Sequence, residues 1–154
     1  MFVRDTSRGI TQIASTDSFG APSDAWSDMP SISGDGRWVA FVSAATNLVP
    51  GDTNGVIDIF VKDMLTGACV RLSTDDGGVE ANGSCWVAGF AEVGGPSISP
   101  DGRYVAFHSV ATNLVPADFN GSLDVFWRDR DTDADGVFDE PGSFRTLRVS
   151  VDSA

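Results

Sequence analysis

The sequence has few basic residues. Ten lysines and arginines stand against 22 aspartates and glutamates, which gives a formal net charge of -12. Nucleic acids and anionic membrane surfaces bind proteins through clustered Lys and Arg, so the composition argues against both as partners. An acidic surface instead favours solubility in salt and the binding of divalent cations.

Long apolar runs and histidine are also scarce. No stretch approaches the ~20 apolar residues of a membrane helix, and the first residues lack the pattern of a signal peptide. One His and two Cys offer no ligand set for structural zinc, although Cys69 and Cys85 could form one disulfide in an exported protein. No apolar spacing of helical period is sustained, so the chain is predicted to be all-β.

The sequence does contain an internal repeat. Residues 30–63 and 96–129 align without a gap at an offset of 66, and 23 of 34 positions are identical. Residues 2–17 match residues 60–75 in part, at an offset of 58. A repeat of this kind determines the architecture, because each unit must bury its apolar face against the next.

Each complete unit is predicted to hold four short strands. In the first unit they lie around residues 31–33, 37–43, 57–62 and 68–74, and the dipeptide Asp35-Gly36 should close a tight hairpin. From Trp38 to Val42 both alternating faces are apolar, so neither face of the sheet can be left in water. Four-stranded antiparallel sheets that are buried on both faces and repeated along the chain are what stacked β-propeller blades require.

The repeat resembles the WD-like propeller repeats of TolB-type proteins. The run Pro-Ser-Ile-Ser-x-Asp-Gly-Arg-aromatic-Val-Ala-Phe stands at residues 30–41 and again at 96–107, and the Asn-Leu-Val-Pro segments that follow are also similar to that family. The resemblance implies an all-β propeller with blades of four antiparallel strands, here as an incomplete ring. It also implies a bacterial periplasmic or extracellular setting, and a role in docking, in binding protein or carbohydrate, or in gating a peptidase.

On this interpretation the chain supplies about two and a half blades. Its parts are the last two strands of a blade (1–17), a connection (18–29), a complete blade (30–75), a long connection (76–95) and a complete blade (96–154) with an Asp-rich insertion (130–142). A closed ring takes about four blades or more, so the remaining blades are expected from a longer chain or from self-association. Uncovered apolar faces on the terminal blades should promote association.

The insertion contains the pattern of a calcium loop, with Asp at positions 1, 3, 5 and 9 and Gly at position 6. Alternate carboxylates converge on one side of a tight turn, and the carbonyl at position 7 supplies a neutral oxygen. The predicted calcium ligands are Asp131, Asp133, Asp135, Val137 and Asp139. Gly142 replaces the bidentate Glu of an EF-hand, so the loop resembles the shorter Asp-rich loops of extracellular repeats, with Glu140 or Asp129 completing the shell. The alternative is a solvated acidic hairpin tip, in which the aspartates repel one another.

A second-rank pattern recurs in both units and could hold a metal or fix a loop. Its members are Asp52, Asn54 and Asp58 in one unit, and Asp118, Asn120 and Asp124 in the other. Hydrogen bonds from side chains to the backbone fix such loops without a cation, and we favour that explanation here. Asn47 and Asn113 are expected to fix turns in the same way.

The remaining candidates are His108 and the tryptophans. His108 occupies the position of Val42 in the other unit and has no nucleophile or carboxylate partner by spacing, so it is assigned to the blade. Trp38 should belong to the core. The other three, Trp26, Trp86 and Trp127, could bind sugars or peptides if exposed, although packing between blades is the preferred explanation.

Two functions are therefore considered. The first is a non-catalytic propeller, stabilised by calcium, that binds or scaffolds a protein or a glycan. The second is the recognition or gating propeller of a larger hydrolase or peptidase, whose catalytic domain lies outside these residues. The sequence contains no nucleophile elbow and no Gly-rich phosphate loop, so no catalytic residues are assigned and the first function is preferred.

Overall fold

The computed structural model describes residues 1–86 and 94–150, and within them the chain is all-β, with ten strands in three antiparallel sheets and no helix. The first sheet is a hairpin of β1 (Phe2–Asp5) and β2 (Ile10–Ile13). The second consists of β3 (Ser27–Ile32), β4 (Trp38–Ser43), β5 (Asp58–Asp63) and β6 (Cys69–Arg71) in that order. The third, ordered in the same way, consists of β7 (Ser97–Ile98), β8 (Tyr104–Ser109), β9 (Asp124–Asp129) and β10 (Arg145–Arg148). No helix of the described part is long and apolar enough to cross a membrane.

The pairing of strands follows the sequence repeat. β4 pairs with β5 from Trp38 opposite Asp63, and β8 pairs with β9 from Tyr104 opposite Asp129. β1 and β2 pair in the register of β5 and β6, with Phe2 in the position of Phe60. Residues 1–13 therefore form the same hairpin as the last two strands of the second sheet.

The predicted strands are found, with different ends. β3 begins at Ser27, inside the span 18–29 that the sequence assigns to a connection, and β10 ends at Arg148. Residues 87–93 of the predicted long connection and residues 151–154 lie outside the described residues.

The turn between β3 and β4 differs from the predicted two-residue hairpin. Gly36 has a positive φ of 75°, but Asp35 does not. Instead, the Asp35 carboxylate accepts hydrogen bonds from the Ser33 hydroxyl (2.6 Å) and the Arg37 N–H (3.0 Å). The Gly36 N–H donates to the Ser33 carbonyl, 3.0 Å away. The Asp35 side chain thus stabilises this turn, where a second residue with positive φ was expected. The second unit repeats the arrangement at Ser99, Asp101, Gly102 and Arg103.

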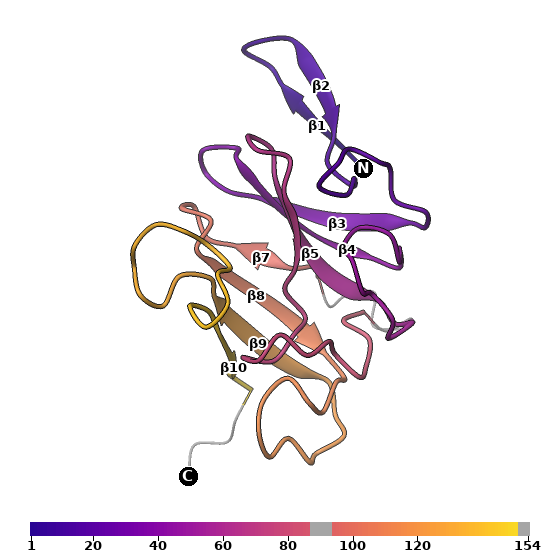
Figure 1. Ribbon diagram of the computed structural model, residues 1–154, viewed down its shortest axis with the longest axis vertical. Helices are drawn as coiled ribbons and strands as arrows, with labels where there is room; N and C mark the ends of the chain where they lie inside the picture. Colours follow the sequence, from indigo (N-terminus) through magenta and orange to yellow (C-terminus); the bar gives the residue numbers. More distant parts are fainter. Residues whose placement is uncertain (87–93, 151–154) are drawn as a thin grey trace.

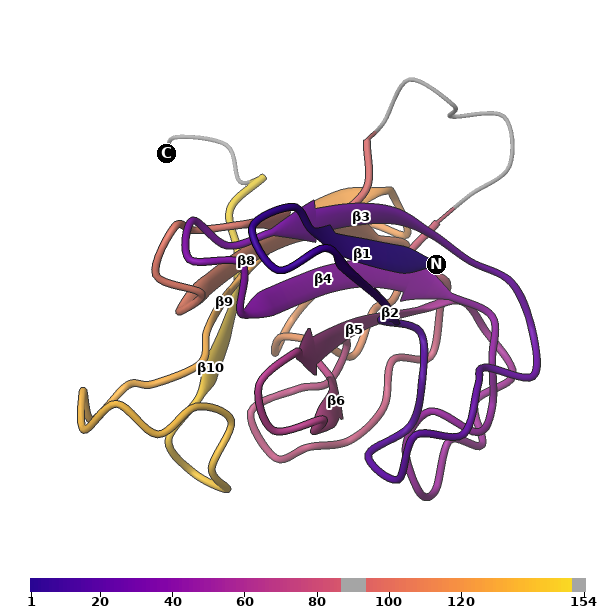
Figure 2. The same ribbon diagram turned by 90° about the horizontal axis from the view of Figure 1, so that it is seen from above.

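The three sheets follow one another along the long axis of the molecule, with the second sheet between the other two (Figure 1). Seen from above, down this axis, the sheets overlap (Figure 2). A first core, which contains Phe41 and Phe60, lies between the hairpin and the second sheet. A second core joins Ile59 and Val61 of the second sheet to Phe126 of the third. Both faces of the second sheet are buried, as the apolar run in β4 predicts.

The two cysteines lie in different cores and are free thiols. Burial raises the pKa of Cys69 and of Cys85 to about 12. The single disulfide that the composition permits is not formed, because Cys69 packs in the core between the hairpin and the second sheet, whereas Cys85 packs in the core between the second and third sheets.

Candidate functional site

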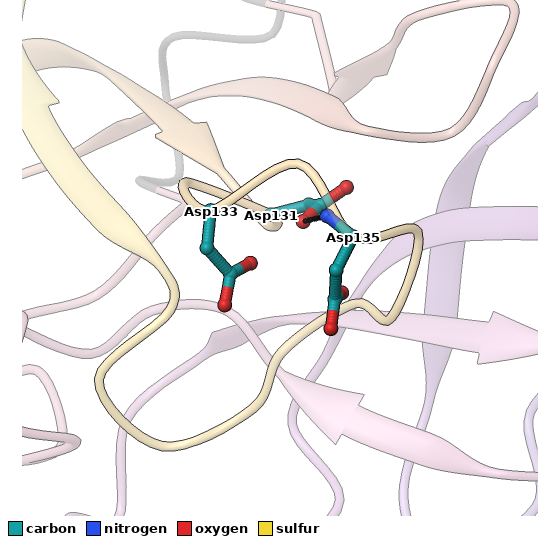
Figure 3. Close-up of side chains that lie close together, drawn as sticks. All are labelled: Asp131, Asp133 and Asp135. Atoms are coloured by element: carbon teal, nitrogen blue, oxygen red, sulfur yellow. Dashed lines mark hydrogen bonds between the residues drawn. The ribbon is translucent and has the colours of Figure 1, made fainter.

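The Asp-rich insertion is a loop between β9 and β10. It brings together three of the predicted calcium ligands, Asp131, Asp133 and Asp135, and one carboxylate oxygen of each lies within 4.8 Å of the others (Figure 3). Asp131 is buried, whereas Asp133 and Asp135 are exposed. Three hard oxygen donors at this spacing form a set that a divalent cation such as calcium prefers.

Hydrogen bonds inside the loop hold these carboxylates in place. Asp131 accepts from the N–H groups of Asp135 (3.1 Å) and Gly136 (3.2 Å). Gly136 has a φ of 88°, a conformation that lets the loop double back as predicted. The Ser143 hydroxyl donates to Asp133 over 2.8 Å, and this hydrogen bond lowers the pKa of that carboxyl.

The fourth predicted carboxylate, Asp139, lies outside this cluster. Its Oδ2 accepts two hydrogen bonds from the Arg130 guanidinium, at 2.9 and 2.6 Å. The side chains of both residues are almost fully buried, with exposed fractions of 3% for Asp139 and 0% for Arg130. Arg130 also lies 4.3 Å from the centre of the Trp38 ring and donates to the Gly102 carbonyl. Asp139 therefore ties the base of the insertion to the body of the fold.

The other proposed members of the shell have separate contacts. The Val137 N–H donates to Asp135 over 2.8 Å. Asp129 accepts two hydrogen bonds from Arg103, at 2.7 and 2.8 Å, and a third from the Asp131 N–H. Glu140 contributes its backbone carbonyl to a turn with Ser143. The structure thus brings three of these carboxylates together, whereas the other two, Asp129 and Asp139, each pair with an arginine.

In the first of the second-rank loops, that of Asp52, Asn54 and Asp58, an arginine lies between the carboxylates that could have held a metal. Arg71 Nη1 lies 3.0 Å from a carboxylate oxygen of Asp52 and 3.7 Å from one of Asp58. Asn54 donates to Asp58 over 2.9 Å and its own amide oxygen accepts from the Val56 N–H. Burial raises the pKa of Asp58 to about 6, although hydrogen bonds from Ser73 and Asn54 oppose this shift.

The second of these loops has the same arrangement. Arg148 Nη1 lies 2.5 Å from Asp118 and 3.5 Å from Asp124, and Asn120 donates to Asp124 over 2.8 Å. The Ser122 N–H donates to the Asn120 amide oxygen. A guanidinium group thus lies against the paired carboxylates in both units, and in each loop an Asn side chain hydrogen-bonds both a carboxylate and a backbone N–H.

The predicted turn residues Asn47 and Asn113 contact the chain that precedes their own sheet. Asn47 donates to the Pro22 carbonyl over 2.8 Å, and Asn113 donates to the Glu80 carbonyl over 2.9 Å. Pro22 and Glu80 are equivalent positions in the repeat. These amides fasten each sheet to the segment that leads into it.

Sequence reasoning missed a pair of buried cations that connect neighbouring repeats. Lys62 on β5 donates to the Thr16 carbonyl over 3.2 Å, and Arg128 on β9 donates to the Thr74 carbonyl over 3.1 Å. Burial lowers the pKa of Lys62, and it lowers that of Arg128 to about 10. The signal was present in the alignment, where basic residues share a strand position that faces the core.

His108 and the pair Trp26 and Trp86 occupy different environments. His108 is 6% exposed on β8, opposite Val125, and burial lowers its pKa. Within residues 1–86 and 94–150 its ring makes no hydrogen bond or ion pair. Trp26 is 46% exposed and meets Trp86 edge to face, with ring centres 5.7 Å apart. Together with Met29 they line a surface cavity of about 390 Å³.

Neither a protein-family model nor a curated protein sequence matches this chain. Its function is therefore inferred from its repeat and its contacts.

Proposed function

We propose that this chain is a segment of a TolB-type β-propeller and that it acts as a non-catalytic binding or scaffolding module outside the cytoplasm. The observation that carries the proposal is the recurrence of the contact between successive repeats. Lys62 and Arg128 reach back from equivalent strands to equivalent carbonyls, those of Thr16 and Thr74. Units that repeat one packing operation form solenoids or propellers, and four-stranded antiparallel units are typical of propellers.

The surface that best suits a ligand is the cavity lined by Trp26, Trp86 and Met29. Trp26 presents nearly half of its area to solvent, in contrast to the buried core aromatics Phe41 and Phe60. Aromatic rings in a shallow cavity bind the apolar faces of sugars and the side chains of peptides. A glycan or a peptide of a protein partner is therefore the proposed ligand class.

Titration of defined oligosaccharides and of defined peptides, followed by tryptophan fluorescence, tests this function. One of the two classes should give a saturable change that is lost in Trp26→Ala. The matched control is Phe19→Ala, which removes an aromatic side chain that is 94% exposed at a different site and should leave binding unchanged. Failure of both ligand classes to saturate, or undiminished binding by Trp26→Ala, would contradict the proposal.

We also propose that calcium binds the insertion through Asp131, Asp133 and Asp135. The proximity of three carboxylates supports this proposal, because a cation would relieve their mutual repulsion. Calcium should raise the melting temperature and give a heat of binding in calorimetry, and Asp133→Asn combined with Asp135→Asn should abolish both. Asp5→Asn removes a negative charge from the distant hairpin and serves as the control. If millimolar calcium gives no heat of binding and no change in melting temperature, the proposal is wrong.

A further inference from the structure

Each sheet has two different apolar faces. In the second sheet Phe41 and Phe60 face the hairpin, whereas Ile59 and Val61 face the third sheet. We call the face toward the preceding sheet the leading face, and the face toward the following sheet the trailing face. Both interfaces inside the chain join a trailing face to the leading face of the next repeat.

The third sheet has an uncovered trailing face. Val125 occupies the position of Ile59, and Val149 that of Leu72 once the longer insertion is allowed for. Val125 is 43% exposed and Val149 52%, whereas Ile59 and Leu72 are 1% and 0% exposed beneath the third sheet. The positions keep their apolar character although nothing in the described residues covers them as the third sheet covers the second.

Nothing in the part of the chain that the structure describes covers the leading face of the hairpin. Phe2 occupies the position of Phe60 and Phe126, yet it is 69% exposed whereas both equivalents are 0% exposed. Arg4 occupies the position of Lys62 and Arg128, but it is exposed and donates to Thr11 of its own hairpin. Among residues 1–86 and 94–150, the apolar and the cationic members of this leading face therefore lack the neighbour that their equivalents have.

We propose that these two faces bind each other in a head-to-tail pair of copies of this chain. Phe2 of one copy packs on Val125 and Val149 of the other, as Phe126 packs with Ile59 and Leu72 within the chain. The interior of the molecule supports this choice of occupant, because it shows which chemistry covers each face and both chemistries occur on one chain. The proposal rests on the repeat stacking of the proposed function but not on its ligand.

Two different faces make a heterologous contact, which leaves one free face of each kind on a dimer and so allows further copies to add. Burying one Phe side chain contributes about 2 kcal/mol, so its loss should weaken association by at least about tenfold. A charged substitution on either face should therefore weaken association.

Sedimentation velocity over a dilution series of the full 154-residue chain tests the proposal. The wild type should sediment faster as its concentration rises, whereas Phe2→Asp and Val125→Asp should each stay monomeric. An equimolar mixture of the two variants should form a dimer and nothing larger, because it retains one intact face of each kind. Phe19→Asp, which adds the same charge outside both faces, should associate like the wild type.

A second measurement does not depend on disruptive substitutions. Phe2→Cys mixed with Val125→Cys should form an intermolecular disulfide under mild oxidation, whereas a Phe19→Cys and Val125→Cys mixture should not. Cys69 and Cys85 are buried and do not compete. A wild type that stays monomeric throughout, variants that associate like the wild type, or a mixture that fails to pair would overturn the proposal. None of these results would follow from failure to bind a glycan or a peptide.

Discussion

Replacing Asp139 with Asn keeps the size of this side chain but removes the charge that faces Arg130. The Arg130 guanidinium is fully buried, and its Nη2 lies 2.6 Å from Oδ2 of Asp139, whose negative charge balances it. Removing one partner of a buried ion pair leaves an uncompensated charge and typically costs about 3 to 5 kcal/mol. For a chain of this length such a loss lowers the melting temperature by about 10 °C.

Urea unfolding in EDTA, followed by tryptophan fluorescence, measures this loss. Asp133→Asn is the matched control, because its carboxylate is exposed and its removal in EDTA should change the free energy of unfolding by no more than about 0.5 kcal/mol. Replacing both partners, with Arg130→Met and Asp139→Leu, should recover at least half of the loss, since no charge is then left buried.

The calcium dependence separates the two roles that Asp139 could have. If Asp139 is the partner of Arg130, the loss of stability appears in EDTA and the calcium affinity falls less than in Asp133→Asn. The reasoning is refuted if Asp139→Asn unfolds like the wild type in EDTA and loses calcium binding as completely as Asp133→Asn.

Three further predictions follow from burial. The folded-state pKa of Asp58 is raised to about 6 from an ordinary value of 3.8, so the native state takes up a proton before the unfolded state does. The contribution of Asp58 to stability should increase as the pH falls from 6 to 4, and Asp58→Asn should remove this part of the pH profile of urea midpoints. Cys69 and Cys85 should react with a thiol reagent only after unfolding, and a fast reaction of either in native protein would contradict the assigned burial. Gly102→Ala should destabilise by about 2 kcal/mol, measured by urea unfolding, because a Cβ there would meet the Trp38 ring and Gly102 has a positive φ.

The all-β class and the positions of the strands were predictable because both follow from patterns of apolar residues. The run from Trp38 to Val42 could be buried only by covering both faces of its sheet, and the structure covers both. The gap-free repeat also required the second and third sheets to pair alike. These features depend on local periodicity and on identity between copies, which a single sequence displays.

The partners of the charged residues were less predictable. The spacing of the insertion groups Asp139 with the other aspartates, but Arg130 stands directly before the loop and binds it instead. A calcium-loop pattern describes the spacing of the carboxylates along the chain and does not show that the adjacent Arg130 folds back against one of them. Arg71 was missed for a different reason, because it lies 13 residues after Asp58 and reaches it only through the pairing of β5 with β6.

The arginines of the two second-rank loops also have a consequence for biochemical work on this protein. Arg71 and Arg148 are covalently part of the chain, so the positive charge between their carboxylates cannot be removed by dialysis or by a chelator. Any loss of order that EDTA produces should start in the insertion and leave residues 52–58 and 118–124 intact. Chelation is therefore a local perturbation. Hydrogen exchange measured in EDTA would compare the insertion with the loops 52–58 and 118–124 as internal references.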